Sequence, residues 1–560
     1  MPSTSVPPPA AEAVDALPRQ RVVDPDFWLT VLAWVTIALS CLQILLMSFG
    51  RDQGIYAVVA NGLLHGKMPY RDLWDFKPPG IYLVYALAQA VFGRSMLAPR
   101  LLEVAGLLGM VVAFRSLAGT FFGLQRVGII GGALAALIHA QLGFWHTGQP
   151  EAFGGFLTAY AVVLTVSDPN RRRAWIAWAG AGALFGVAFL LKPPLGGGAL
   201  VCAAYLAQRE YRRTSRRLPA LWPVLVVGLA SLVPIGAVLL WFKLRGAWPA
   251  LYWTFIQFTP GYTRLGWHQH GAASAFYYGL EEAFFHFSAL AAFGVIAALV
   301  IRPTHTRERE GLFLFFGIVS VHIAGIAMQG KFFQYHYSAT LPLIAFIAGL
   351  GLYKLWRRCL PGGAGGMIAF ASFLVVAAVM RTAVRDLPGS FWWRSMVRME
   401  YLLGKTSYSS RELLDRELYY VADYNLDADR RVAMDIAQNT PKNAHIYVWG
   451  FEPVIYWVAR REPSSRFIYD VPQRVTWQRR YARDQLMQDL ERRPPDVIVV
   501  EKNDVFSWVT GDRRDSARAL ETFPELQQLI EQHYERDKQI EDFTLYNRVQ
   551  SPDDGAGAGR

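Results

Sequence analysis

Acidic side chains that could take a proton from a hydroxyl group lie at the edges of long apolar blocks. Asp52 follows directly on the first block, where a partly desolvated carboxylate can act as a general base. The same carboxylate can cap the helix expected at 53–65, because Asp is a preferred N-cap, and one side chain can do both. Glu151 begins a later block after a turn without Lys or Arg. An acid at a membrane boundary is costly and therefore a functional candidate, although the helix dipole also favours one there.

Two lysines could neutralise a phosphate at the same kind of boundary. Lys77 and Lys192 each precede two prolines, and each stands where an apolar segment meets a polar turn. An ammonium group can also anchor a helix by reaching from the membrane toward water, which is the alternative for either residue. The repetition of Lys-Pro-Pro favours a shared site for the two lysines.

Aromatic residues accompany these charges and are candidates for the wall of a substrate cavity. Tyr56 and Tyr70 belong to the first loop, and His336 and Tyr337 to a later aromatic turn. A belt of interfacial aromatic residues is the alternative for the later turn. The candidate cavity residues are Tyr56, Tyr70, His336 and Tyr337.

The elements that must position these residues are membrane-spanning helices. Of the 560 residues 53% are hydrophobic and only 18% are charged, and the apolar residues form long blocks. About 20 apolar residues cross the roughly 30 Å hydrocarbon core of a membrane. We therefore predict about eleven transmembrane helices, near 28–49, 99–119, 127–143, 152–167, 174–191, 195–208, 220–242, 284–301, 312–328, 337–353 and 367–384.

Charge sets the predicted orientation. The net charge of +12 could suggest a nucleic-acid partner, but Lys and Arg cluster between apolar blocks, at 171–173, 209–217, 302–309 and 354–358. Basic turns alternate with turns that are poor in Lys and Arg, as the positive-inside rule expects, so we predict no nucleic-acid partner. A span at 79–93 would break this alternation, so we interpret that segment as an interfacial helix. The protein is then a multi-pass protein of the cytoplasmic (inner) membrane.

The predicted domains follow from this orientation. Residues 1–27 form a disordered cytoplasmic N-terminus, and 28–384 form the transmembrane domain, with interfacial helices in the outward loops 50–98 and 244–283. Charge becomes dense after 385, and strand-length apolar runs at 445–450, 466–469 and 496–500 alternate with helical stretches at 411–437, 476–492 and 516–533. That alternation predicts an extracytoplasmic α/β domain over 385–550, before a disordered tail at 551–560.

No cofactor is predicted from the residues. Three cysteines occur without a CxxC pair, and the C-terminal domain contains no glycine-rich phosphate loop. We predict no metal-ligand set, although a divalent metal ion stays possible.

With these residues in place, the sequence resembles the C-type (GT-C) glycosyltransferases. Within them it is similar to the bacterial relatives of the protein O-mannosyltransferases and of the lipid A aminoarabinose transferase, which are glycosyltransferase families 39 and 83. The resemblance covers most of 28–384. It rests on Asp52-Gln53-Gly54-Ile55-Tyr56, Pro69-Tyr70-Arg71-Asp72, Phe76-Lys77-Pro78-Pro79, Pro150-Glu151-Ala152-Phe153, Lys192-Pro193-Pro194 and His336-Tyr337.

The resemblance implies transfer of a sugar from a polyprenyl-phosphate donor to an acceptor hydroxyl at the outer membrane face, with inversion. Asp52 matches the catalytic acid and Glu151 the second acidic position, while Lys77 and Lys192 match positions that hold the donor phosphate. Two departures from the aminoarabinose transferases, Ile55 in place of Arg and Phe76 in place of an acid, leave the acceptor (glycan, lipid or protein) and any metal open. A transporter or flippase for lipid-linked glycans, or a glycan-binding membrane protein without activity, is the alternative.

Overall fold

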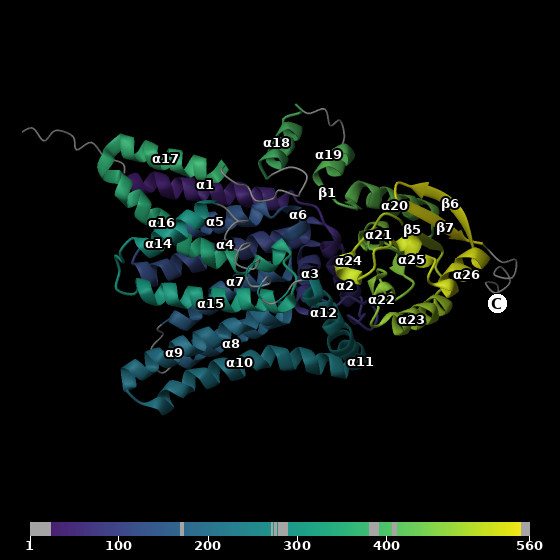
Figure 1. The fold of residues 1–560 in the computed structure, drawn as a ribbon, viewed down its shortest axis with the longest axis horizontal. Coiled ribbons are helices and arrows are strands. Elements are labelled where there is room, and N and C mark those ends of the chain that lie inside the picture. Colours follow the sequence, from purple (N-terminus) through teal and green to yellow (C-terminus); the bar gives the residue numbers. More distant parts are fainter. Residues whose placement is uncertain are drawn as a thin grey trace, which may run out of the picture.

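Long helices packed side by side form one end of the molecule, and a smaller domain with a β-sheet forms the other (Figure 1). In this computed structural model, residues 24–167, 173–269, 271, 273, 277, 289–379, 391–405 and 411–549 are described. The predicted disordered segments 1–27 and 551–560 lie outside the described residues, except for the last four residues of the first segment.

Every predicted span contains a helix. These helices are α1 (Pro25–Leu45), α4 (Leu97–Phe122), α5 (Gln125–Gln141), α7 (Pro150–Val166), α8 (Ala174–Leu191), α9 (Gly198–Thr214), α10 (Arg217–Leu244), α14 (Ala289–Val300), α15 (Glu308–Gln329), α16 (Leu341–Cys359) and α17 (Gly363–Val379). Within the described ranges, six helical segments are long and apolar enough to cross a membrane: α1, α4, α8, α10, α15 and the combined segment Leu341–Ala377. The count of eleven spans stays a prediction.

Proline sets several helix boundaries in the bundle. Pro25 and Pro150 occupy the first turns of α1 and α7, where the missing N–H is not needed. Pro193 follows Lys192, whose backbone is extended at φ −154° and ψ 116°, because a proline disfavours helical geometry in the residue before it. The chain therefore leaves α8 at Lys192 and enters a 3₁₀ turn, η2 (Pro193–Gly197).

Short helices lie between the bundle and the sheet domain (Figure 1). They are α2 (Arg51–Leu64), α3 (Gly80–Phe92), α6 (Gly143–His146), α11 (Trp248–Tyr252) and α12 (Thr259–Gln269), with a π-helical turn, η3 (Trp253–Phe258). Helix α3 coincides with the predicted interfacial helix at 79–93. Its 13 residues span about 20 Å, less than the roughly 30 Å of a hydrocarbon core.

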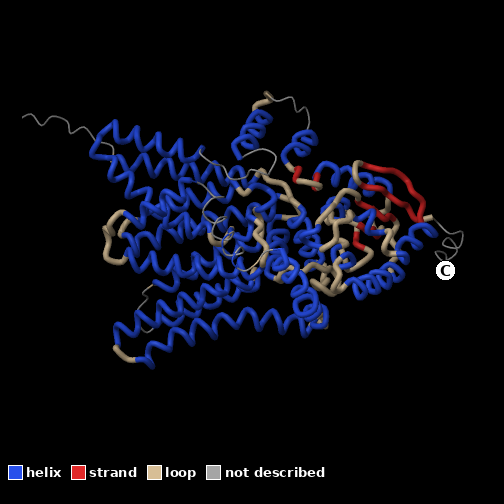
Figure 2. The backbone as a smooth tube through the Cα atoms, in the orientation of Figure 1, coloured by secondary structure: helices blue, strands red, loops and turns tan. Residues whose placement is uncertain are grey.

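The sheet domain holds five strands in the order β4-β3-β5-β7-β6, drawn in red in Figure 2. The central strands β3 (His445–Trp449) and β5 (Val497–Glu501) are parallel to each other, as are β3 and β4 (Glu462–Pro463). The strands β6 (Tyr534–Ile540) and β7 (Phe543–Arg548) add an antiparallel edge. The predicted strands at 445–450 and 496–500 are thus confirmed, and their apolar runs suit strands covered on both faces.

Helices surround this sheet and connect it to the bundle. They are α18 (Phe391–Leu402), α19 (Arg411–Leu418), α20 (Leu426–Asn439), α21 (Val454–Ala459), α22 (Val471–Arg474), α23 (Arg479–Arg492), α24 (Ser507–Thr510), α25 (Ser516–Leu520) and α26 (Pro524–His533). A two-stranded hairpin, β1 (Tyr420–Val421) with β2 (Tyr424–Asn425), separates α19 from α20.

Three details of the sequence prediction are wrong. The run 466–469 is no sheet strand, because Phe467 forms a single bridge with Trp74 of the first loop, whose N–H donates to the Arg466 carbonyl at 2.7 Å. The predicted helix 411–437 is broken by the hairpin β1-β2. The predicted helix 516–533 is split at Pro524, which has no N–H to continue a helix from the preceding turn.

Candidate active site

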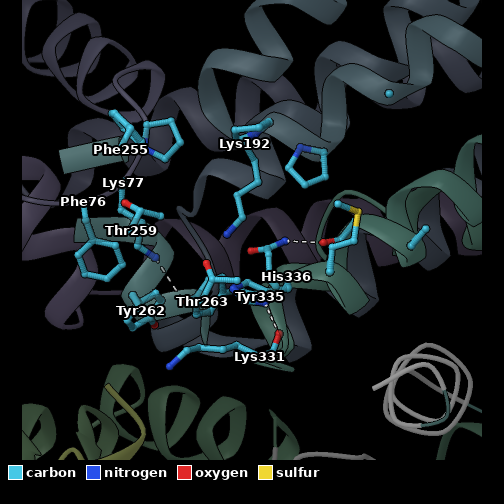
Figure 3. A pocket seen from close by; sticks show the side chains of 18 of the residues that line it. Phe76, Lys77, Lys192, Phe255, Thr259, Tyr262, Thr263, Lys331, Tyr335 and His336 are labelled. Atoms are coloured by element: carbon cyan, nitrogen blue, oxygen red, sulfur yellow. Dashed lines mark hydrogen bonds between the residues drawn. The ribbon is translucent and has the colours of Figure 1, made fainter. Parts of the chain in front are cut away.

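A cavity of about 640 Å³ opens where the ends of α8 and α15 meet the first loop and α12 (Figure 3). Most of its wall is apolar, and its polar groups include Lys77, Lys192, Lys331 and His336. Its lining includes Phe76, Lys77, Pro78, Lys192, Pro193, Pro194, Gly197, Phe255, Thr259, Tyr262, Thr263, Val321, Ala324, Gly325, Met328, Gln329, Lys331, Tyr335 and His336. A mostly apolar cavity with a few converging polar groups is the usual form of a ligand site.

Lys77 joins this cavity to Asp52. Its Nζ lies 3.5 Å from Asp52 Oδ2 and donates to the Tyr335 hydroxyl at 3.2 Å. Burial alone would lower the pKa of Lys77, but the Asp52 carboxylate and the hydroxyl groups of Tyr335 and Tyr56 raise it well above its ordinary value. Lys77 is therefore a fixed positive charge at the cavity wall.

Lys192 forms a second acid–lysine pair with Glu151. The Nζ of Lys192 lies 2.8 Å from Glu151 Oε1, and the ammonium points into the cavity (Figure 3). Burial lowers the pKa of Lys192 in spite of this partner, while Glu151 itself is almost fully buried. The turn before Glu151 contains no basic partner, so its counter-ion comes from the end of α8.

His336 faces the same pair as a neutral ring. Its Nε2 lies 3.9 Å from Glu151 Oε1, and its Nδ1 is 2.8 Å from the Lys331 carbonyl. Burial, with the charges of Lys192 and Lys77, lowers the pKa of His336 well below its ordinary value. Because a carbonyl oxygen can only accept, Nδ1 carries the proton and Nε2 is left as an acceptor.

The first turn of α2 and the turn before α7 hold the two acids in place. The Gln53 side chain accepts from the Gly50 N–H at 2.9 Å and donates to the Thr147 carbonyl at 2.5 Å. Gln149 donates to Asp52 Oδ2 at 3.2 Å and accepts from the Tyr56 hydroxyl at 2.8 Å. Asp52 and Glu151 are therefore fixed relative to each other by side chains of neighbouring residues.

A buried ion network inside the bundle supports the same turn. Arg100 lies 2.9 Å from Glu103 and donates to the Thr147 hydroxyl at 2.8 Å. Glu103 accepts from the Gly148 N–H at 2.5 Å and lies 2.7 Å from His139. Arg100 and Glu103 thus support the turn that leads to Glu151.

The loop that carries Lys77 is held by tyrosines. The Tyr70 hydroxyl donates to the Lys77 carbonyl at 2.7 Å, and the Tyr82 hydroxyl oxygen lies 3.1 Å from the same carbonyl. Tyr82 donates its proton to Asp75 at 2.7 Å, and Tyr469 of the C-terminal domain donates to the other oxygen of Asp75 at 2.7 Å. Asp75 is fully buried, and this burial raises its pKa against the effect of both hydroxyl groups.

The structure brings together Asp52, Glu151, Lys77, Lys192 and His336, all predicted from the sequence. Tyr56, Tyr70 and Tyr337, predicted as cavity residues, are fully buried and are not among the residues that line this cavity. Tyr56 and Tyr70 support Gln149 and Lys77 from behind, and their contact with a substrate stays a prediction.

Sequence reasoning missed four residues at this site: Gln149, Tyr262, Lys331 and Tyr335. Lys331 lies 3.8 Å above the ring of Tyr262 and donates to the Trp508 carbonyl of the C-terminal domain. Burial lowers the pKa of Lys331 to about 7. Its signal in the sequence is its place in an outward turn directly after an apolar block, as for Lys192.

Metal ligands are not gathered at this cavity in the described part of the chain. The group of three acids close enough to share an ion there is Asp423, Glu452 and Glu501, which lies in the C-terminal domain next to Arg51. The cavity itself offers ammonium groups and one neutral imidazole. Asp52 and Glu151, which are not among its lining residues, are paired with the cavity lysines Lys77 and Lys192. Such an arrangement suits an anion, and an acid beside it could accept a proton.

The helical bundle and the short helices at one end of it define a membrane protein with the GT-C fold of glycosyltransferases. Two solved structures of ArnT from Cupriavidus metallidurans are similar to this chain over almost their whole length. The structure bound to undecaprenyl phosphate has a TM-score of 0.55 at 16% identity, covering 94% of this chain and 99% of that one. The apo structure has a TM-score of 0.57 at 15% identity, covering 93% and 98%.

A family model agrees with this fold over part of the bundle. The model for dolichyl-phosphate-mannose-protein mannosyltransferases matches residues 76–241, a range that includes Lys77, Glu151 and Lys192. No curated protein matches the sequence.

Proposed function

We propose that this protein transfers a sugar from a polyprenyl-phosphate donor to an acceptor hydroxyl at the outer face of the cytoplasmic membrane. The observation that carries the proposal is the pair of acid–lysine contacts, Asp52 with Lys77 and Glu151 with Lys192, at one largely apolar cavity. The ArnT structure solved with undecaprenyl phosphate and the mannosyltransferase family model support a lipid phosphate as the carrier.

In the proposed reaction, the acceptor oxygen attacks the anomeric carbon from the side opposite the phosphate. The bond from that carbon to the phosphate oxygen breaks, and its electron pair leaves with the polyprenyl phosphate. The acceptor's proton passes to Asp52, and the new glycosidic bond has inverted configuration. No further reactant is needed for the atoms and charges to balance.

The lysines act on the leaving group. Negative charge grows on the phosphate as the bond breaks, and cations fixed in advance at that place lower the barrier. At an effective dielectric constant of 20, one ammonium about 4 Å from a unit negative charge contributes about 4 kcal/mol. Lys77 and Lys192, which both line the cavity (Figure 3), can supply two such contacts.

The apolar wall suits the carrier's lipid tail. Pro193, Pro194, Val321 and Met328 continue from the lysines along α15 and η2. A prenyl chain along this wall would remain in the membrane while its phosphate meets Lys77 and Lys192. In this proposal the C-terminal domain lies outside the cytoplasm, next to the site.

The test is turnover by purified Asp52→Asn in detergent, with undecaprenyl-phosphate mannose and undecaprenyl-phosphate aminoarabinose as donors. We expect kcat to fall by about 10²- to 10⁴-fold, the usual contribution of a general base, while undecaprenyl phosphate still binds. The surface variant Asp484→Asn is the matched control and should retain full turnover, because that side chain is exposed.

Two results would contradict the proposal. Normal turnover by a folded Asp52→Asn protein would show that Asp52 is not the general base. Unchanged binding of undecaprenyl phosphate to Lys77→Gln and Lys192→Gln would show that these lysines do not hold the phosphate. Sugar transfer in detergent, without a sealed compartment, also separates this enzyme from a transporter, which requires two compartments.

A further inference from the structure

A second polar centre lies beside the first turn of α2, on the side of the C-terminal domain. Three carboxylates converge there: Asp423 from the turn of the hairpin β1-β2, Glu452 just before α21, and Glu501 at the end of β5. One oxygen of each lies within 4.8 Å of one oxygen of the others. Glu452 and Glu501 are almost fully buried, while Asp423 is 15% exposed.

Arg51 balances only part of this charge. Its Nη2 lies 2.7 Å from Asp423 Oδ2, and its Nε donates to Glu452 Oε1 at 3.0 Å. The guanidinium carbon also packs against the adjacent rings of Phe451 and Phe506, at 4.9 and 4.5 Å from their centres, which holds it in place. Three carboxylates therefore face one fixed cation.

A fourth carboxylate is an independent sign of a missing partner. Asp429 of α20 is fully buried, and the hydrogen-bond partner of its carboxyl group is another carboxyl group, that of Glu452. Neither oxygen of Asp429, nor Oε2 of Glu452, receives a hydrogen bond from an N–H or hydroxyl donor. The other charged neighbours of Asp429 are Glu501, Arg51 and Asp423.

Solvent can reach this centre through a polar cavity. Asp423 lines a pocket of about 600 Å³ together with Asn425, Ala428, Asn503 and Asp542. This pocket lies apart from the cavity that holds Lys77 and Lys192, with which it shares no lining residue. An ion can therefore reach Asp423, at the rim of this centre, without passing the proposed active site.

We propose that Asp423, Asp429, Glu452 and Glu501 form a binding site for a hard divalent cation of the calcium class. The donors are all carboxylate oxygens, which Ca²⁺ prefers, and no His or Cys joins the ligand set as at zinc sites. Oxygens at about 2.3–2.6 Å from Ca²⁺ lie up to about 5 Å apart across the ion, which agrees with the 4.8 Å spacing of the cluster.

The place of this site in the chain gives the cation a role. Arg51 directly precedes Asp52, and the four acids come from four segments of the C-terminal domain. A bound cation would fix these segments around Arg51 and so hold the first turn of α2 in position. This positioning effect on turnover rests on the proposed function, whereas the cation site does not.

The experiment measures Ca²⁺ binding by the full-length protein in detergent after removal of metal with a chelator. We expect one Ca²⁺ per chain by equilibrium dialysis and a higher apparent Tm with Ca²⁺ than with chelator. Tb³⁺ should give sensitised luminescence that Ca²⁺ quenches, because Trp145 lies beside Arg51, 5.7 Å from its guanidinium carbon.

Variants assign the ligands. Glu501→Gln and Asp429→Asn should each weaken Ca²⁺ binding at least about tenfold, because affinity depends on the number of charged ligands. Glu535→Gln, an exposed acid on β6, is the matched control and should bind as the parent does. Should a buried variant fail to fold, Asp423→Asn at the partly exposed rim makes the same test.

Three results would overturn the site: no Ca²⁺ bound by the parent protein, Ca²⁺ affinity unchanged in the three ligand variants, or retention of Zn²⁺ in place of Ca²⁺. The two proposals fail separately. If Ca²⁺ binds but leaves sugar transfer unchanged, the positioning role is wrong and the site stands. If no transfer occurs under any condition while Ca²⁺ binds, the proposed function fails and the cation site stands.

Discussion

At the scale of single residues, the pKa values of three lysines at one cavity are shifted differently because the lysines have different partners. Lys77 has Asp52 and two tyrosine hydroxyl groups around it, which raise its pKa although burial opposes this. Lys192 has Glu151, which does not fully offset burial, so its pKa is lowered. Lys331 has a carbonyl and an aromatic ring but no acid, and burial lowers its pKa to about 7.

If the cavity binds a lipid phosphate as proposed, we expect Lys331 to make its affinity depend on pH. A phosphate in the cavity favours the protonated amine, so binding takes up a proton wherever free Lys331 is neutral, above about pH 7. We expect the affinity for undecaprenyl phosphate to fall as pH rises from about 7 to 9, by at most tenfold per unit. Isothermal titration calorimetry at several pH values measures this dependence.

The comparison with Lys331→Met isolates that effect, since the ligand's own phosphate titrates equally with both proteins. The variant should show a weaker dependence on pH than the parent, and Lys243→Met, which removes an exposed lysine of α10, should behave as the parent does. Identical profiles for the parent and Lys331→Met would contradict the coupling.

At the scale of elements, sequence alone predicted what composition and proline determine. The apolar blocks placed a helix at each expected span, and Lys-Pro-Pro marked the end of α8 because Pro193 keeps Lys192 out of helical geometry. The prediction of a strand at 466–469 was wrong because the backbone partner of this run, Trp74, lies almost 400 residues away in another domain. The local sequence pattern contains no information about such a distant partner.

We expect a close contact between α3 and α8 to set the spacing of Lys77 and Lys192, the two lysines proposed to hold the phosphate. A Cβ on Gly80 would lie 2.7 Å from the carbonyl carbon and oxygen of Leu190, which are backbone atoms and cannot turn aside. Gly80 follows Lys77 by three residues, and Leu190 precedes Lys192 by two. We expect Gly80→Ala to separate the helices, destabilise the protein by about 1–3 kcal/mol and weaken undecaprenyl phosphate binding.

The matched control for this variant is Gly228→Ala in α10, where no atom lies within 4 Å of the new Cβ. That substitution should be neutral or stabilise the helix by about 0.5–1 kcal/mol. Apparent Tm and the Kd for undecaprenyl phosphate are measured for both variants. Parent-like values for Gly80→Ala would show that the contact does not set the lysine spacing.

At the scale of the whole molecule, the C-terminal domain completes the loops that carry the site. The Trp74 ring packs against Phe467 and Tyr469 at 5.9 and 5.6 Å, and Tyr424 donates to the Phe49 carbonyl at 2.8 Å. The ion pairs of Arg51 with Asp423 and Glu452 join residues about 370 and 400 positions apart. A change of composition near 385 predicted a second domain, but no spacing rule could predict these contacts.

Asp75 in the first loop depends on a hydrogen bond from Tyr469 of the C-terminal domain. The variant Tyr469→Phe tests how much this contact between the two domains stabilises the protein. Burial raises the pKa of Asp75, and its ionised form is stabilised against this burial by the hydroxyl groups of Tyr469 and Tyr82, with the Lys77 ammonium and the Phe76 N–H. Removing one donor should cost about 1.5–3 kcal/mol where Asp75 is ionised and less at lower pH, where a proton replaces the lost partner. Apparent Tm should therefore fall more at neutral than at acidic pH.

The control variant is Tyr534→Phe, which loses a hydrogen bond to the uncharged Pro495 carbonyl. This loss should cost about 1 kcal/mol at both pH values. An equal pH dependence of apparent Tm in the two variants would contradict this role for Asp75.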